Sequence, residues 1–197
     1  MQRIFKVVVI GGISMLLSIN LQAQLNPRVG IKAGGNLGIG AINFKGNNSN
    51  EFAVGPGGYL GGLMEISGKN KGSKWKFQSE LLANYNTVQF DSRHFRMLIL
   101  SMPLMMRYFI VPNFSFNAGI SLNANLSGDF VAKRPVTLEG YQVSTFQPGV
   151  LAGMSYYIHK GLFIDLRYNH YLLNAVESSV FAFQYGSLQL GMGYKFR

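Results

Sequence analysis

The feature that most constrains the fold is a strict alternation of apolar and polar residues. In residues 114–126 every second residue is apolar, beginning with Phe114 and Phe116, and the residues between them are Ser, Asn or Gly. Residues 187–197 alternate in the same way, with Leu188 and Leu190 opposite Ser187 and Gln189. A period of two is that of a β-strand, whose successive side chains point to opposite faces. Both segments are therefore predicted to be strands with one apolar face.

Six other segments follow this period less strictly and bring the number of predicted strands to eight. They cover residues 29–37, 52–66, 74–85, 98–108, 149–158 and 162–169. Most are about 10 to 15 residues long, which is enough for a tilted strand to cross a membrane. Pro56, Pro103 and Pro148 lie inside these segments. Because proline cannot donate a hydrogen bond to the strand ladder, a bulge or local unpairing is expected at each.

The connections between the predicted strands alternate in length. Those after odd-numbered strands are long, at residues 38–51, 86–95, 127–145 and 173–185, and those after even-numbered strands are short, at 67–73, 110–113 and 159–161. Outer-membrane barrels have long extracellular loops and tight periplasmic turns. This alternation of long and short connections therefore predicts antiparallel, up-and-down topology with both termini in the periplasm.

Alternation alone does not say which face points inward, because a soluble lipocalin-like barrel would enclose its apolar face. The polar face here is mostly Gly, Ser and Asn with a few charges, which suits a narrow, filled interior. Aromatic residues lie near segment ends, as in the girdles of membrane barrels: Trp75, Tyr85, Tyr108, Tyr156 and Tyr194. The sequence therefore predicts an eight-stranded antiparallel transmembrane β-barrel in a bacterial outer membrane.

The first 23 residues have the organisation of a cleaved signal peptide. Arg3 and Lys6 precede an apolar run over residues 7–19, and Ala23 offers a small residue at the cleavage position. The run is shorter than the roughly 20 residues that a spanning helix needs. We therefore expect a signal peptide at 1–23 and one barrel domain at 24–197. The chain contains no Cys, which excludes disulfides and thiolate metal sites.

Seven charged residues fall on the polar face and are predicted to point into the lumen. They are Lys32, Glu65, Glu80, Arg107, Asp165, Arg167 and Lys195. Because buried charges must be paired, we expect the three carboxylates to contact the two arginines and Lys32 or Lys195. Such a network forms either a constricted, proton-sensitive pore or a structural plug. An eight-stranded barrel leaves room only for side chains, which favours the plug.

Several short motifs resemble the PorT-like outer-membrane β-barrel family, a porin family of Bacteroidetes. They are GYLGGL at 58–63, FQSELL at 77–82, LILSMPL at 98–104 with Arg107 and Tyr108, residues 149–153, FIDLRY at 163–168 and GMGYKF at 191–196. Their order and spacing cover nearly the whole chain after residue 23. The resemblance implies a proline in the fourth strand, as at Pro103. Most members of that family have no assigned activity, and the member that names it is linked to a protein secretion system.

The residues that catalysis would need are scattered. His94, His159 and His170 lie apart from one another and show no metal-ligand spacing, and His170 has no Ser within two residues. We therefore expect no catalytic site, metal or cofactor. The net charge of +10 is spread along the chain, which favours contact with anionic lipid or polysaccharide over nucleic acid.

The predicted function is that of a non-enzymatic, monomeric surface barrel that is structural or binds through its loops. The candidate contact residues Lys133, Arg134 and Tyr141 lie in the longest predicted loop. The expected partners are outer-membrane lipid and, through the final strand with Phe196 near its end, the outer-membrane assembly machinery. A narrow solute or ion channel and an accessory component of a secretion system are the alternatives.

Overall fold

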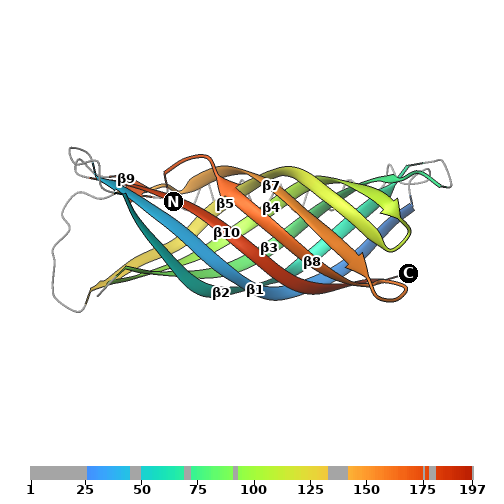
Figure 1. Ribbon diagram of the computed structural model, residues 1–197, viewed down its shortest axis with the longest axis horizontal. Coiled ribbons are helices and arrows are strands. Elements are labelled where there is room, and N and C mark those ends of the chain that lie inside the picture. Colours follow the sequence, from blue (N-terminus) through green and yellow to red (C-terminus); the bar gives the residue numbers. More distant parts are fainter. Residues whose placement is uncertain are drawn as a thin grey trace.

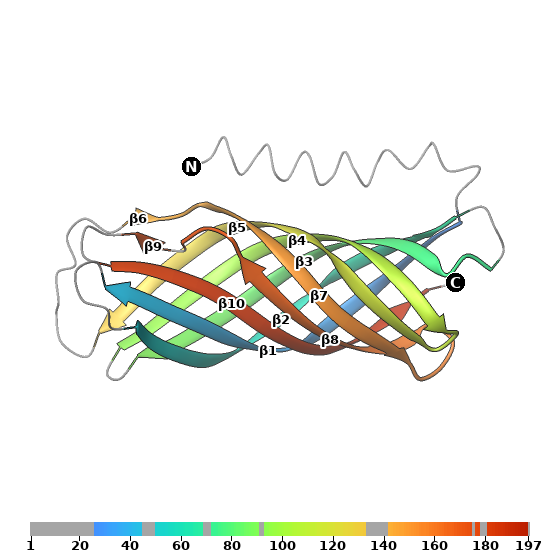
Figure 2. The ribbon, with the colours of Figure 1, turned by 45° about the horizontal axis from the view of Figure 1, so that its top comes forward.

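The chain forms a single antiparallel sheet that closes into a barrel (Figures 1 and 2). The computed structural model describes residues 26–44, 50–68, 72–90, 93–132, 142–174, 176–177 and 181–196. The wall consists of β1 (Asn26–Phe44), β2 (Asn50–Ser67), β3 (Trp75–Phe90), β4 (Arg93–Val111), β5 (Phe114–Ala132), β7 (Phe146–Tyr157), β8 (Leu162–Tyr171) and β10 (Phe181–Lys195). Two short strands, β6 (Gln142–Val143) and β9 (Val176–Glu177), pair beside β10. The described residues include no helix with the length and hydropathy of a membrane span.

The eight wall strands pair in sequence order, and β1 pairs with β10 to close the barrel. The predicted eight-stranded, up-and-down barrel is therefore confirmed. The pairing also fixes how strongly the strands are staggered. When the paired residues are followed once round the wall from Arg28, they return to β1 at Gly38, ten positions later. This shear of ten positions tilts the strands, as closure of a barrel requires.

The two ends of the barrel differ. The β2–β3, β4–β5 and β7–β8 connections, together with Asn26 and Phe196, lie at one end, which we call the turn end (Figure 1). The other four connections lie at the opposite end, the loop end. The short turns agree with prediction, but the long connections are shorter than expected. β1 continues to Phe44 and β2 begins at Asn50, and only two residues separate Phe90 from Arg93.

These differences correct the predicted loops at 38–51 and 86–95, which are mostly strand. The loops at 127–145 and 173–185 are shortened in the same way, because β5 ends at Ala132 and β10 begins at Phe181. Gly38 and Gly40 continue the alternation opposite Leu37, Ile39 and Ala41, and the predicted strand therefore ended too early. In the structure they face the lumen and leave room for larger side chains: a Cβ at Gly40 would clash with the Phe183 ring.

The polar face of the wall points inward and the apolar face outward, as predicted. On β5, Ser115 and Asn117 are at most 3% exposed, whereas Phe116 and Ile120 are 46% and 51% exposed. β8 and β10 repeat this pattern. A barrel with an apolar exterior and a polar interior is the arrangement that lipid requires, since lipid cannot hydrogen-bond a polar surface.

Aromatic side chains on the outer face gather near the turn end. Trp75 and Tyr108 lie with ring centroids 4.7 Å apart, and Tyr194 contacts Phe196 at 5.6 Å. Tyr156 is exposed on the neighbouring part of the wall and accepts a hydrogen bond from Asn113 in the β4–β5 turn. This ring has the position of an interfacial girdle.

The prolines disturb the ladder without shifting its register. Pairing between β2 and β3 is interrupted beside Pro56, between the Val54–Gln89 and Gly57–Asn86 pairs, and resumes in the same register. The β3–β4 ladder is interrupted in the same way opposite Pro103, while Pro148 lies one residue beyond the β7–β8 ladder. Local unpairing is therefore found at Pro56 and Pro103. The register shifts occur elsewhere, in the β4–β5 ladder: one at Leu98/Ile99, and one at Phe109/Val111 near the β4–β5 turn.

Candidate functional site: the charged lumen

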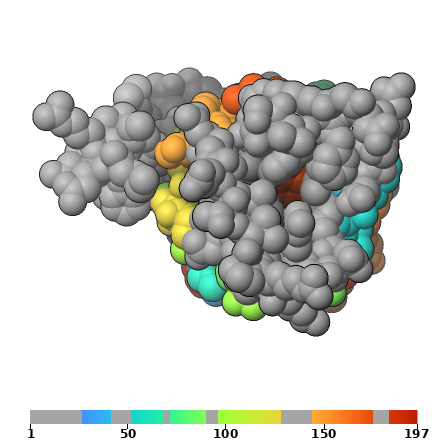
Figure 3. Space-filling model, turned by 90° about the vertical axis from the view of Figure 1, so that its left-hand side faces the viewer, coloured from blue at the N-terminus to red at the C-terminus, as the bar shows by residue number. Residues whose placement is uncertain are grey.

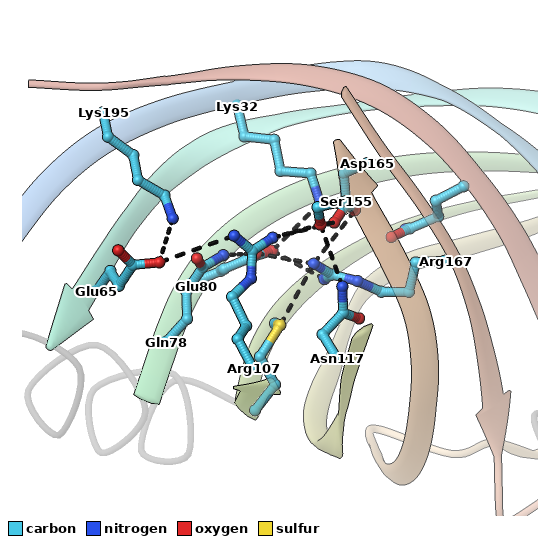
Figure 4. Close-up of polar contacts among 12 residues, drawn as sticks. Lys32, Glu65, Gln78, Glu80, Arg107, Asn117, Ser155, Asp165, Arg167 and Lys195 are labelled. Atoms are coloured by element: carbon cyan, nitrogen blue, oxygen red, sulfur yellow. Dashed lines mark hydrogen bonds and ion pairs between the residues drawn. The ribbon is translucent and has the colours of Figure 1, made fainter. Parts of the chain in front are cut away.

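The seven predicted lumen residues lie together inside the turn-end half of the barrel. They come from six strands: Lys32 from β1, Glu65 from β2, Glu80 from β3, Arg107 from β4, Asp165 and Arg167 from β8, and Lys195 from β10. None is more than 3% exposed. Figure 4 shows the lysines reaching from one side of the wall towards the carboxylates and arginines in the centre. We call these seven residues the charge cluster.

The centre of the charge cluster is a set of ion pairs between Glu80, Asp165, Lys32 and Arg167. Arg167 donates to both oxygens of Glu80, at 2.9 and 2.8 Å, which is the bidentate geometry that makes such pairs strong. Lys32 donates to Asp165 at 2.5 Å. Lys32 is also 3.8 Å from Glu80, and Arg167 is 3.3 Å from Asp165, so each cation contacts both carboxylates. The four groups hold one another in place across the lumen.

Arg107 joins this centre to the turn end. Its guanidinium donates to Asp165 at 3.3 Å and to the Ser155 hydroxyl at 2.6 Å. It also donates to the Tyr157 hydroxyl at 2.5 Å and lies 3.8 Å from Glu65. The Arg107 side chain is fully buried, so these contacts replace the water that a guanidinium would otherwise bind.

Glu65 is surrounded by cations at the turn end of the lumen. Lys195 donates to one of its carboxylate oxygens, and Lys76 donates to the other at 3.3 Å. Lys195 also donates to Tyr157 at 2.6 Å. Lys76 and Lys195 lie over the rings of Phe109 and Tyr157, at 4.5 and 5.1 Å. Such cation–π contacts add to the ion pairs that both lysines make with Glu65.

Sequence reasoning placed the charges but did not include their neutral partners in the site. Ser155 donates to Asp165 at 2.7 Å, and Gln78 donates to Glu80 at 2.5 Å. Asn117 donates to Ser155 at 3.2 Å. The alternation of side chains along each strand could have identified all three residues. Each lies on the inward face, beside a charged residue of its own or a neighbouring strand. Lys76 could have been added to the cluster on the same ground.

Between the charge cluster and the loop end, amides and hydroxyls occupy the middle of the lumen. Asn84 donates to Ser101 at 2.9 Å and accepts from Gln189 at 3.0 Å. Asn123 donates to the Gln147 carbonyl at 2.8 Å. These contacts link β3 to β4 and β10, and β5 to β7. The lumen therefore stays filled beyond the charges.

The loop-end part of the lumen is apolar and aromatic, which corrects the expectation of an interior dominated by Gly, Ser, Asn and charges. Tyr171 stacks on Tyr185 at 5.1 Å between centroids, and Tyr185 lies 6.2 Å from Phe183. Val88, Met97 and Ile99 are also buried, each at most 1% exposed. We call these six residues the loop-side layer. Figure 3 views the barrel from this end and shows β10 (dark red) in the middle of the face and β5 (yellow) at its rim.

The charged groups that would line a pore are covered by other side chains. Arg107, Asp165 and Arg167 are 0% exposed. Within the described residues, no three His, Cys, Asp or Glu side chains are grouped as metal ligands. His159 is exposed in the β7–β8 turn, and His170 stacks on Tyr168 at 6.3 Å. The contact candidates Lys133, Arg134 and Tyr141 lie outside the described residues.

The sequence matches a family described as "Outer membrane protein beta-barrel domain" over residues 16–177. The chain belongs to this family. Its place is accordingly the bacterial outer membrane, where the apolar exterior contacts lipid. No curated protein matches the chain in sequence.

Solved structures of outer-membrane proteins have a similar fold. Neisserial surface protein A is 16% identical, with a TM-score of 0.51 over 85% of this chain and 97% of that one. A major outer membrane protein from Thermus thermophilus is 15% identical, with a TM-score of 0.51 over 86% of this chain and 99% of that one. At such identities the likeness concerns the fold alone.

Proposed function

We propose that this outer-membrane barrel is a non-enzymatic surface protein whose lumen is permanently plugged and whose activity resides in its loops. The observation that carries the proposal is the burial of the charge cluster. Three carboxylates and four cations from six strands contact one another inside the wall, and none is more than 3% exposed. Buried ion pairs of this kind add little net stability over an apolar core, but breaking one is costly. They therefore hold the lumen shut and the strands in register.

The orientation we propose places the turn end in the periplasm and the loop end outside the cell. Its support is the family's usual arrangement of tight periplasmic turns and longer extracellular loops. The signal peptide at 1–23 belongs to this proposal, as does recognition of the final strand by the assembly machinery. In this orientation Lys133, Arg134 and Tyr141 lie in the connection between β5 and β6, on the extracellular side. A basic and aromatic loop suits an anionic surface ligand such as a polysaccharide.

Single-channel recording in planar bilayers tests the plug. The wild-type barrel should show no stable unitary conductance, while a known porin reconstituted in the same way supplies the positive control. A steady conductance that Arg107→Ala or Glu80→Ala abolishes would identify a narrow channel and overturn the plugged barrel.

Ligand binding by the loop is tested separately on intact cells. Replacing Lys133 and Arg134 with Gln should weaken binding to anionic polysaccharide, whereas Arg96→Gln, which removes one exposed charge from the wall, should not. Equal binding by all variants would remove the loop from the proposal. The PorT-like resemblance adds a second readout, because a deletion strain that secretes normally would exclude an accessory role in secretion.

A further inference from the structure

The outer wall carries a broad apolar groove. It crosses β2, β1, β10 and β8, which are neighbours in the barrel, and has a volume of about 550 Å³. Its walls are Ile31, Leu60, Leu162, Met192 and Tyr194. Because these side chains point outward, the groove opens towards the membrane and not into the lumen.

Small residues form the floor of the groove, which therefore lies below the large side chains on either side. Gly62 and Ala33 face outward there, beside Gly61 and Gly193. A Cβ at Gly62 would meet only the Gly30 carbonyl oxygen, at 3.8 Å. The space above Gly62 is therefore free, and its apolar lining suits a lipid chain better than a polar ligand.

A basic turn borders the groove at the turn end. Lys160 is exposed and lies two residues before Leu162. Gly161, between them, packs against Tyr194: a Cβ there would lie 3.3 Å from the Tyr194 ring. Lys160 thus lies close to the level of the aromatic girdle at the turn end, where lipid headgroups meet water.

The other exposed charges of the described turn end have the same sign. Arg28 and Lys74 are exposed, while the carboxylates of the described turn-end half, Glu65, Glu80 and Asp165, are buried and paired. A surface with cations and without accessible carboxylates attracts anionic headgroups. The groove and the charge therefore point to one kind of ligand.

We propose that the groove binds one acyl chain of an anionic phospholipid whose phosphate contacts Lys160. The inference rests on the orientation proposed above, since the turn end then lies in the inner, phospholipid-containing leaflet. A second copy of the chain is the competing occupant. Phospholipid is favoured because a two-fold pair across the groove would bring two basic turns together at the same membrane level.

Native mass spectrometry of the detergent-extracted barrel tests the groove. The protein is extracted from vesicles of equal parts phosphatidylglycerol and phosphatidylcholine, and the lipids retained are counted. Wild type should keep one phosphatidylglycerol. Gly62→Leu should lose most of it, because the new side chain fills the floor.

Gly58→Leu is the matched control. Gly58 lies on the same strand and face, has room for a side chain with the Gly34 oxygen 3.5 Å away, and does not line the groove. Equal lipid retention by Gly62→Leu and Gly58→Leu overturns the proposal. A dimer that Gly62→Leu disrupts overturns it in favour of the second copy.

Lys160→Gln tests the headgroup. It should reduce the preference for phosphatidylglycerol over phosphatidylcholine about fivefold, whereas Lys74→Gln, a lysine in the β2–β3 turn, should change it less. If Lys160→Gln leaves the preference for phosphatidylglycerol unchanged, Lys160 does not contact the phosphate. If the wild-type barrel retains no lipid but does not conduct, only this inference fails. If the wild-type barrel retains lipid but conducts, only the plugged lumen fails.

Discussion

The two halves of the lumen fill the same barrel by different means. Near the turns, the charge cluster fills it with ion pairs that cross between strands, such as the bidentate contact of Arg167 with Glu80. Near the loops, the loop-side layer fills it with stacked and aliphatic side chains, such as Tyr171 on Tyr185. The wall is continuous between them, so the difference lies in the side chains alone.

Because of this difference, losing one side chain should cost more stability in the charge cluster than in the loop-side layer. A buried charge needs its partner, because an unpaired charge in a medium without water costs several kcal/mol. A buried aromatic or aliphatic side chain needs only to be surrounded, and a small loss of volume is correspondingly cheaper. The charge cluster therefore specifies which strands must meet, whereas the loop-side layer tolerates more variation.

The largest expected effect is that of Arg167→Met. The substitution keeps much of the volume but leaves Glu80 and Asp165 without their shared guanidinium, so the free energy of unfolding should fall by about 3–5 kcal/mol. Urea titration of the barrel in phospholipid vesicles measures it. The exposed Arg96→Met should cost less than about 0.5 kcal/mol. Equal costs would show that the buried pairs are not needed.

Removing a tyrosine hydroxyl should lower the free energy of unfolding more beside the charge cluster than in the loop-side layer. Tyr157→Phe deletes an acceptor for Arg107 and Lys195 and should cost about 2 kcal/mol, because hydrogen bonds to charged groups are strong. The Tyr185 hydroxyl has no hydrogen-bond partner among the described residues, so Tyr185→Phe should be nearly neutral. Urea unfolding of the two variants under identical conditions measures both. If Tyr185→Phe were the more costly, the contrast between the halves would fail.

A double-mutant cycle sharpens the role of pairing. Glu80→Gln and Arg167→Met together should cost about 1.5 kcal/mol less than the sum of the single changes, because the second change removes the charge that the first left unpaired. The same unfolding titration gives all four free energies. Additive costs would mean that Glu80 and Arg167 act independently despite their bidentate contact.

The smallest expected effect concerns packing in the loop-side layer. Ile99→Val removes one methylene from a fully buried side chain and should cost about 1 kcal/mol. Ile120→Val, on the lipid-facing side of β5, should cost less, since lipid fills the space that is left. Thermal unfolding of the two variants in the same vesicles compares them. A larger loss for Ile120→Val would contradict the assignment of the two faces.

Alternation predicted the eight strands and the inward set of charges because side-chain direction in a strand follows residue parity, which the sequence shows directly. It failed where inward residues are not polar. Met97, Ile99 and Val88 face the lumen, and Gly38 and Gly40 lie within a strand that was expected to have ended. At these positions the neighbouring strand decides what fits, and a single strand's pattern does not contain that information.

The sequence by itself determined the strand count, the outward apolar face and the residues that share the lumen. Only the tertiary structure decided their partners. Whether Lys32 meets Asp165 or Glu65 depends on the ten-position stagger that accumulates round the wall, which sets the height of each strand relative to all others. The groove beside Lys160 has the same origin, because it forms where small residues of adjacent strands come into register. Register is a property of the closed sheet, and no single segment encodes it.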